Sequence, residues 1–550
     1  MKLVTVEQMK QLEQAADAAG HSFAMMMELA GRAVASAVAQ RIAVKNKIVL
    51  VLIGPGNNGG DGLVAAHYLK EAGAKVVCYL WKPRADDSNM KRVKEDGIVC
   101  LHNGENGAHQ TLRKALQGVD IVVDALLGTG VTRPIEGELK EILSIVGQAV
   151  NARRAQRFAP TDLFPSLQPL PRPYVVAVDV PSGLNCDSGE IDPVTLPADL
   201  TVTFAAPKMG QFRFPGAGIL GELVVADIGI DPALEQGLPV DVATAQMVAQ
   251  RLPPRPRDAH KGTFGKALIV AGSVNYTGAA YLAGAAATRI GTGLVTLAVA
   301  QPLHPIIAAK LAEATFLLLP HNLGVLNLDA IEVLAHVLPS YKALLVGPGL
   351  GQEKETVAFV HALFGIRQVT KGRIGFGQSS TLPPPSLILP PLVIDADGLN
   401  ALAQIERWWT CLPPNSVLTP HPGEMARLTP GETPPAERID WAAGQAARWG
   451  QIVVLKGAHT VIAAPDGRVC VLPFANPGLA TAGTGDVLAG CIVGLLAQGL
   501  SPFDAAVCGA YVHGLAGQRA AQKLGPAGMV AGDVLNELPY AIMQLEPGIT

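Results

Sequence analysis

The sequence has little charge, few aromatic side chains and no excess of basic residues. Charged residues make up 16% of the 550 residues, where about a quarter is usual, and the formal net charge is −3. Because nucleic-acid binding depends on clustered lysine and arginine, this balance argues against that class of protein. Hydrophobic residues still make up 49% of the chain, which excludes intrinsic disorder, since disorder requires low hydrophobicity and high net charge.

The chain also lacks paired cysteines and long apolar runs. Its 7 cysteines include no Cys-x-x-Cys pair, so we expect reduced, mostly buried thiols rather than a zinc site or a disulfide scaffold. The N-terminus lacks the apolar core of a signal peptide. The most apolar stretch, 487–500, is interrupted by Gly490 and Gly494 and is too short to span a bilayer. We therefore expect a soluble, cytoplasmic protein without a membrane partner.

Glycine and proline are plentiful instead, at 59 and 42 residues, and the glycines show no period of three, which excludes collagen. Short β-branched runs alternate with helical segments, as in parallel α/β sheets. The predicted strands are 47–53, 75–80, 121–123, 174–178, 200–204 and 223–226, then 266–270, 294–299, 343–346, 392–394, 417–418 and 452–455.

The predicted fold class is α/β, with an N-terminal Rossmann-like three-layer sandwich followed by a second α/β domain. We expect the first domain to span residues 1–235 and the second 258–550. A proline-rich linker at 236–257 should join them. Two Pro-rich segments, 151–173 and 371–391, interrupt the pattern and are predicted to be surface insertions, where extra length costs little.

The turn after the first strand has the composition of a phosphate-binding loop. Residues 54–62 read GPGNNGGDG and precede a helix predicted at 63–72. Backbone amides at such a turn, with the helix N-terminus behind them, form an anion site. The acidic residue that grips a ribose at the end of the second strand is missing, which speaks against an ordinary dehydrogenase. Asn57, Asn58 and Asp61 add side-chain oxygens beside the expected phosphate.

Two further strands end on acidic turns, DALLGTG at 124–130 and DVPSG at 179–183. The carboxyl ends of parallel strands are where α/β sheets bind ligands, so these turns and the glycine-rich turn form a plausible site. Asn58, Asp124 and Ser182 offer hard oxygen atoms with a single carboxylate. Such a set suits a monovalent cation better than magnesium.

These three motifs, in this order, resemble the YjeF N-terminal family of NAD(P)H-hydrate epimerases over residues 1–235. The resemblance implies that Asn58, Asp124 and Ser182 bind potassium and that Asp179 faces the substrate. Epimerising C6 of a hydrated nicotinamide needs a proton acceptor or a stabiliser of a cationic ring, and Asp179 suits either role. The implied contacts to the hydrated nucleotide are Asn57, Asn58, Gly59, Gly60, Asp61, Gly128, Thr129, Gly130, Val131, Thr132, Arg133 and Pro134.

The second half contains a stronger anion-binding motif. NPGLATAGTGD ends at Asp486 and leads into an apolar helix predicted at 487–497. Gly483 and Gly485 let the backbone turn its amides toward an anion at the helix N-terminus. Asp486 stands in the first turn, where it can take a proton from a substrate hydroxyl. His421 lies between two prolines after a strand, which favours a substrate contact.

With HKGTFG, GPGLG, DADGLN, TPHPGE and KGAHT, this motif resembles the ADP-dependent NAD(P)H-hydrate dehydratases of the ribokinase-like superfamily over about 258–545. The resemblance implies a ribokinase-like C-terminal domain that uses ADP with Mg²⁺, and Asp486 as its catalytic residue. The insertion at 371–391 departs from the family pattern. The implied contacts to ADP are Lys456, Gly457, Ala458, His459, Thr460 and Gly485, and those to the hydrate are Ala279, Gly349, His421 and Asp486.

The combination predicts a fused repair enzyme. The first domain would interconvert the R and S forms of hydrated NADH and NADPH (NADHX and NADPHX). The second would dehydrate the S form while ADP is consumed to AMP and phosphate. We also expect a homo-oligomer. Two alternatives stay open, a kinase acting on a vitamin or sugar hydroxyl and a non-enzymatic binding module. The residues do not decide between the NADH and NADPH hydrates, or between ADP and ATP.

Overall fold

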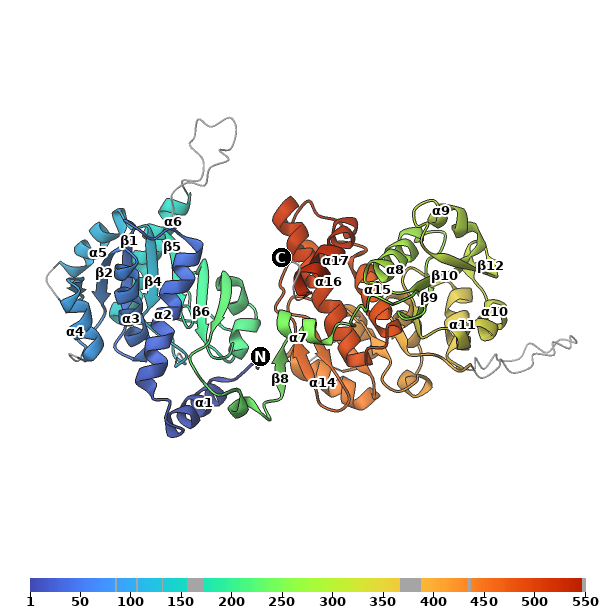
Figure 1. Cartoon of the computed structure of the whole chain (residues 1–550), viewed down its shortest axis with the longest axis horizontal. Helices are drawn as coiled ribbons and strands as arrows, with labels where there is room; N and C mark the ends of the chain where they lie inside the picture. Colours follow the sequence, from blue (N-terminus) through green and yellow to red (C-terminus); the bar gives the residue numbers. More distant parts are fainter. Residues whose placement is uncertain are drawn as a thin grey trace, which may run out of the picture. The chain divides into compact units, whose positions relative to one another are not determined.

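The computed structural model describes residues 1–84, 87–104, 107–130, 132–155, 173–366, 387–432 and 437–546. The chain divides into two compact units, Met1–Leu238 and Pro239–Thr550 (Figure 1). Most of the two predicted insertions, 151–173 and 371–391, lies outside the described residues, as does Val131. None of the helices in the described part of the chain has the length and apolarity that crossing a membrane requires.

The first unit contains a seven-stranded parallel sheet in the order β3-β2-β1-β4-β5-β6-β7. Its strands are β1 (Ile48–Ile53), β2 (Lys75–Leu80), β3 (Val99–His102), β4 (Ile121–Ala125), β5 (Tyr174–Val178), β6 (Leu200–Phe204) and β7 (Glu222–Ala226). Its helices are α1 (Val6–Ala18), α2 (Phe23–Arg41), α3 (Asn57–Glu71), α4 (Ser88–Glu95), α5 (Ala108–Gln117) and α6 (Gly137–Ala155).

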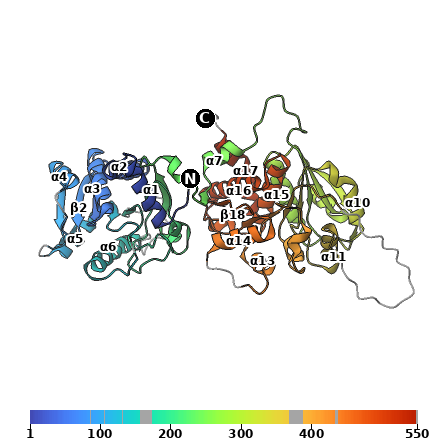
Figure 2. The same ribbon diagram turned by 90° about the horizontal axis from the view of Figure 1, so that it is seen from below.

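The central strand β1 shows why the sheet has helices on both faces. Its sequence is IVLVLI, and successive side chains of a strand point to opposite faces. Val49, Val51 and Ile53 belong to the core shared with α1 to α4, whereas Leu50 and Leu52 belong to the core shared with α5 and α6. The resulting three layers confirm the predicted sandwich (Figure 2).

Helix α3 begins earlier than the sequence predicted. We expected a turn over 54–62, but the helix starts at Asn57, directly after Gly56 as its N-cap. The glycines serve close backbone packing here. A Cβ on Gly59 would lie 2.0 Å from the Gly54 oxygen, and one on Gly54 would lie 1.9 Å from the Leu126 oxygen. The NNGGD residues therefore form the first turns of a helix pressed against two strand ends.

The second unit is built on a ten-stranded sheet in the order β11-β10-β9-β14-β15-β16-β17-β18-β19-β8. Strands from β11 to β17 are parallel, β18 pairs antiparallel with both neighbours, and β8 pairs parallel with β19. The strands are β8 (Val240–Val242), β9 (Lys266–Val270), β10 (Leu294–Ala300), β11 (Thr315–Leu319), β14 (Ala343–Val346), β15 (Leu392–Ile394), β16 (Val417–Leu418), β17 (Ile452–Leu455), β18 (Val461–Ala463) and β19 (Val469–Val471), with a separate hairpin β12 (His321–Asn322) and β13 (Val325–Leu326).

Helices pack against this sheet, and α8, α15, α16 and α17 contact one another (Figures 1 and 2). The helices are α7 (Ala245–Arg251), α8 (Thr277–Arg289), α9 (His304–Ala308), α10 (Ala330–Val337), α11 (Lys354–Leu363), α12 (Asp397–Leu402), α13 (Pro422–Leu428), α14 (Arg438–Trp449), α15 (Thr484–Ala497), α16 (Pro502–Leu524) and α17 (Ala531–Leu545).

The segment expected to be a linker, 236–257, is largely part of the second unit. Strand β8 extends the second sheet by pairing with β19, and α7 packs on α16 and α17. The unit boundary therefore falls at Leu238. The apolar residues Val240, Val242 and Val248 are buried in the second unit, which explains why this part of the proline-rich stretch packs on that unit.

Candidate active sites

The three residues predicted to bind potassium meet at the carboxyl edge of the first sheet. The Asp124 carboxylate accepts hydrogen bonds from Ser182 Oγ at 2.6 Å and from the Ser182 amide at 2.8 Å. Asn58 Nδ2 donates to the Leu127 carbonyl at 2.8 Å, and the Leu127 amide donates to Ser182 Oγ. All three side chains are buried.

One atom of this group has no partner. Asn58 Oδ1 is buried and receives no hydrogen bond from any described residue. An acceptor in that condition costs free energy unless a cation or water satisfies it. Within the described residues there is no group of three or more His, Cys, Asp or Glu that could hold a metal ion. A single carboxylate with neutral oxygens fits a monovalent ion better than a divalent one.

Asp179 lies beside this group and is paired with a buried lysine. Lys208 is 1% exposed, and its ammonium donates to Asp179 Oδ1 at 2.6 Å and to Thr203 Oγ1 at 2.8 Å. Thr203 Oγ1 also donates to Asp179 Oδ1, and Gln211 donates to the Asp179 carbonyl. Asp179 itself adopts a left-handed backbone with φ of 64°. These contacts fix the orientation of its carboxylate.

Asp61 has a different environment. Its side chain is 9% exposed, and no described residue forms a hydrogen bond or an ion pair with its carboxyl group. Burial raises the pKa of this carboxyl well above its usual value, and the nearby charges of Asp179 and Glu13 raise it further, outweighing Arg84 and Lys208. Both effects favour the neutral, protonated form of this carboxyl group.

The predicted nucleotide-binding loop after β4 borders a cavity of about 410 Å³. Its wall includes Trp81, at the end of β2, and Leu139 from α6. Five of the predicted contacts, Gly128, Gly130, Thr132, Arg133 and Pro134, line it. The end of β2, where a dehydrogenase would have an acidic residue that binds the ribose, thus carries the indole of Trp81. Lys82 Nζ lies 4.6 Å from the centre of this ring.

The glycine-rich turn is held from outside by an arginine that the sequence did not single out. Arg84 Nη1 donates to the Gly56 carbonyl at 2.8 Å and to the Gly54 carbonyl at 3.3 Å, and its side chain pairs with Asp87. Carbonyls that point to Arg84 leave the amides of the turn for a ligand.

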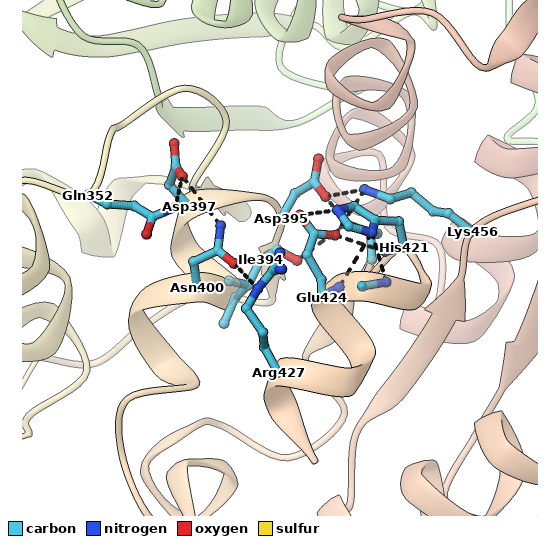
Figure 3. Close-up of polar contacts among 11 residues, drawn as sticks. Gln352, Ile394, Asp395, Asp397, Asn400, His421, Glu424, Arg427 and Lys456 are labelled. Carbon is cyan, nitrogen blue, oxygen red and sulfur yellow. Dashed lines mark hydrogen bonds and ion pairs between the residues drawn. The ribbon is translucent and has the colours of Figure 1, made fainter. Parts of the chain in front are cut away.

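In the second unit, three strand ends and the start of α13 bring polar side chains together (Figure 3). Lys456 follows β17, and its ammonium donates to Asp395 Oδ1 at 2.7 Å and lies 3.7 Å from Glu424 Oε2. Thr419 Oγ1 also donates to Asp395. Although burial by itself lowers the pKa of Lys456, the carboxylates of Asp395, Glu424 and Asp486 raise it above its usual value. The lysine therefore stays charged.

Asp486 has no such partner among the described residues. It lies in the first turn of α15, after Gly483 with φ of 90°. Burial raises the pKa of its carboxyl to about 7, the charge of Asp395 adds to this, and Lys456 opposes it. An ideal Cβ on Gly485 would lie 3.6 Å from Lys456 Nζ, so the ammonium and the amides of this helix end face the same space. That space suits a phosphoryl group next to a titratable acid.

The loop after Lys456 is fixed by Arg438 from the start of α14. Its guanidinium donates to the carbonyls of Leu455 and Lys456 at 3.0 Å and also to Ala458. Gly457 and His459 in this loop have positive φ angles of 143° and 51°. A cation on three carbonyls stabilises that unusual path, which the predicted ADP contacts at Lys456, Gly457, Ala458, His459 and Thr460 require.

A second group of polar side chains connects the turns that carry the predicted hydrate contacts. Figure 3 shows this group, Asp397, Asn400 and Arg427, beside the first. An ideal Cβ on Gly349 would meet the Ala279 Cβ at 2.6 Å, so these two residues are neighbours. The GPGLG turn is tied to α12 because the Gly351 amide donates to Asp397. Asn400 Oδ1 accepts a hydrogen bond from Arg427 Nε at 2.9 Å. His421 caps α13 and presents an exposed imidazole.

Sequence reasoning thus selected the turns and missed their supports. None of the sequence motifs predicts a role for Lys208, Arg84 or Arg438, and Asp395 belongs to the DADGLN motif without a predicted role. A charged residue shortly after an apolar strand, such as Lys208 after β6, is a signal that could have pointed to a buried pair.

Comparison with protein families matches both units. Residues 267–540 match the model described as NAD(P)H-hydrate dehydratase, and residues 23–210 match the model described as YjeF-related protein N-terminus.

Full-length relatives carry both parts. The chain is 39% identical to the bifunctional NAD(P)H-hydrate repair enzyme of Moorella thermoacetica, covering 99% of this chain and 97% of that protein. It is 37% identical to that of Thermofilum pendens, with the same coverage. Among solved structures, the ADP/ATP-dependent NAD(P)H-hydrate dehydratase of Bacillus subtilis, co-crystallised with ATP/Mg²⁺, is 31% identical and covers 56% of this chain and 99% of that one, with a TM-score of 0.45.

Proposed function

The chain belongs to the family of bifunctional NAD(P)H-hydrate repair enzymes, and we propose how its two units divide the work. The first unit epimerises the R and S forms of NADHX and NADPHX at C6. The second unit dehydrates the S form and consumes ADP. The observation that carries this proposal is that each unit places an unpaired carboxyl group beside a lysine–aspartate pair, at an anion-binding turn.

In the first unit, the substrate's nucleotide part occupies the cavity bordered by Gly128 and Arg133, and its nicotinamide ring lies at Asp179. The Asp179 anion, oriented by Lys208 and Thr203, stabilises positive charge on the ring as the C6–oxygen bond weakens.

Potassium fits the group formed by Asn58, Asp124 and Ser182, because Asn58 Oδ1 is a buried oxygen without a partner. Burial raises the pKa of the Asp124 carboxyl, although the hydrogen bonds from Ser182 and Leu126 lower it. A cation at this place would favour the ionised form. It would supply positive charge that fixes the loop of Leu127 and Gly128 next to the cavity.

In the second unit, Asp486 takes the proton of the C6 hydroxyl. The hydroxyl oxygen then attacks the β-phosphoryl group of ADP, which releases AMP. Phosphate then leaves C6 with the electron pair of the C6–O bond, and loss of a proton from C5 forms the C5=C6 double bond of the dihydronicotinamide. A pKa of about 7 gives Asp486 the form that suits a base at neutral pH. The α15 amides and Lys456 stabilise the charge on the group being transferred.

Mg²⁺ is expected to arrive with the nucleotide. The described residues contain no preformed cage of acids for it, and magnesium usually keeps waters and binds through one or two carboxylates plus phosphates. Asp395, whose Oδ2 lies 3.9 Å from an ideal Cβ on Gly485, is a carboxylate placed to do so, and the ion would neutralise phosphate charge. Self-association and a cytoplasmic location remain predictions from the sequence.

The proposal is tested by giving purified protein a mixture of both epimers of chemically hydrated NADH with ADP, and following the absorbance of the restored dihydropyridine. Full recovery supports both activities. Recovery of only half removes the epimerase assignment, and no recovery overturns both. Accumulation of a phosphorylated vitamin or sugar in parallel assays would favour a kinase instead.

A further inference from the structure

Asp61 is a buried acid that the proposed epimerase mechanism has so far left without a task. It lies in helix α3, whose N-terminal turns pack against the ends of β1 and β4. The residue is 9% exposed and lies one helical turn after Asn58, whose side chain contacts the Leu127–Gly128 loop at the cavity. No described residue donates a hydrogen bond to it or pairs with it. Burying an acid in this way is costly, which singles it out.

The charged groups that face Asp61 come from four elements. Asp179 follows β5, Glu13 lies on α1, Arg84 follows β2 and Lys208 follows β6. Lys208 is already engaged by Asp179 and Thr203, and Arg84 by Asp87 and two carbonyls. Neither cation is therefore committed to Asp61. The Asp179 anion on the other side opposes ionisation of Asp61.

The two carboxyl groups therefore sit in opposite environments within one site. Asp179 accepts hydrogen bonds from an ammonium and a hydroxyl, whereas Asp61 has neither. Pairs of carboxyl groups that are separated in this way divide into a proton donor and an anion. The same burial that raises the pKa of Asp61 equips it as the donor.

We propose that Asp61 is a catalytic acid of the epimerisation, which protonates the C6 hydroxyl so that it leaves as water. This inference rests on the proposed function of the first unit. The C6–O bond breaks with its electron pair on oxygen, which receives the Asp61 proton. The ring nitrogen's lone pair forms the C6=N1 bond, and the cation is stabilised by Asp179.

Epimerisation is completed from the other face. A water oxygen bonds to C6, the C6=N1 pair returns to nitrogen, and the Asp179 carboxylate takes the proton released by that water. Proton exchange through solvent then returns both carboxyl groups to their starting states. One water is lost and one is gained, so the substrate changes only its configuration.

The test uses the full chain carrying Asp61→Asn, which keeps the shape and the polarity but cannot donate an acidic proton. Both epimers of hydrated NADH are supplied with ADP, and the recovery of NADH is resolved into a fast S phase and a slow phase limited by epimerisation. The control Glu71→Gln removes an exposed acid at the far end of the same helix.

We expect Asp61→Asn to slow the second phase by roughly 10²–10⁴-fold, the usual effect of losing a general acid, while the first phase and the control stay unchanged. Wild type should also lose epimerisation as pH rises, and the variant should lack this limb. A second phase within threefold of wild type, or a rise in KM alone, overturns the role of Asp61. If wild type itself recovers only half the substrate, the proposed function of the first unit fails instead.

Discussion

Both units combine a lysine–aspartate pair with a second, unpaired carboxyl group, but they place these groups differently. Each pairs a lysine with an aspartate, Lys208 with Asp179 at 2.6 Å and Lys456 with Asp395 at 2.7 Å. Each also leaves a second carboxyl group without a partner among the described residues, Asp61 in one and Asp486 in the other. The lysine's charge is taken by the paired acid, so the unpaired acid keeps a raised pKa.

The difference lies in what surrounds the unpaired acid. Asp486 stands at the amides of α15 with Lys456 nearby, so its pKa rises only to about 7 and it can accept a proton at neutral pH. Asp61 is buried more deeply, and burial together with the charges of Asp179 and Glu13 raises its pKa well above the usual value, which favours its protonated form. In the proposed mechanisms, the same arrangement supplies a base where phosphate binds and an acid where a hydroxyl leaves.

The largest expected effect belongs to the second unit. Asp486→Asn should lower the ADP-dependent dehydration rate by about 10²–10⁴-fold, because the proton acceptor is gone, while ADP still binds. Stopped-time NADH recovery from the S hydrate measures the rate. The control Asp466→Asn removes an exposed acid paired with Arg468 away from the site and should change nothing. Turnover above a tenth of wild type would contradict the assignment.

The second largest effect is expected at the proposed potassium site of the first unit, formed by Asn58, Asp124 and Ser182. Asn58→Leu removes the unpartnered Oδ1 and should reduce epimerisation about tenfold and abolish its activation by potassium, since a lost charged contact is worth roughly 1.5–3 kcal/mol. The epimerisation phase is followed against K⁺ concentration at constant ionic strength, with dehydration in the same samples as the internal comparison. Equal K⁺ activation in wild type and variant would rule out this site.

A smaller effect should come from the support of the nucleotide loop. Arg438→Ala removes hydrogen bonds to three carbonyls around Gly457, so the KM for ADP should rise about tenfold with kcat changed less than threefold. Arg438→Lys keeps the charge and should recover part of the loss. A fall in kcat at unchanged KM would show that Arg438 does not act through the loop.

The smallest effect concerns stability. Because the pKa of Asp486 is raised from 3.8 to about 7 in the folded chain, the unfolded chain releases this proton first as pH rises, and the free energy of unfolding falls across that interval. Asp486→Asn should therefore melt a few degrees above wild type near pH 8 and level with it near pH 4, since roughly 1 kcal/mol moves Tm by 2–4 °C in domains of this size. Equal melting curves at both pH values would show that the acid is not buried at this cost.

The parts of the fold and of the sites that could be predicted from the sequence are those decided by residues close together in the chain. Apolar runs such as 48–53 predict a strand, because neighbouring side chains must all be buried, and the turns after strands predict where ligands bind. The pairing of Lys208 with Asp179 joins the ends of two strands, and no local pattern identifies Asp179 as the partner of Lys208. The short strand β3, which has no fully buried residue, and the early start of α3 were missed for the same reason: tertiary contacts decide them.

The most direct test of the acid and base roles is to record pH–rate profiles for both reactions in one preparation of the full chain. Epimerisation should fall with rising pH, because Asp61 must be protonated. Dehydration should rise through about pH 7, because Asp486 must be ionised. Asp61→Asn should remove the first dependence and leave the second. Two profiles that rise or fall together, or an unchanged epimerisation profile in Asp61→Asn, would contradict the account.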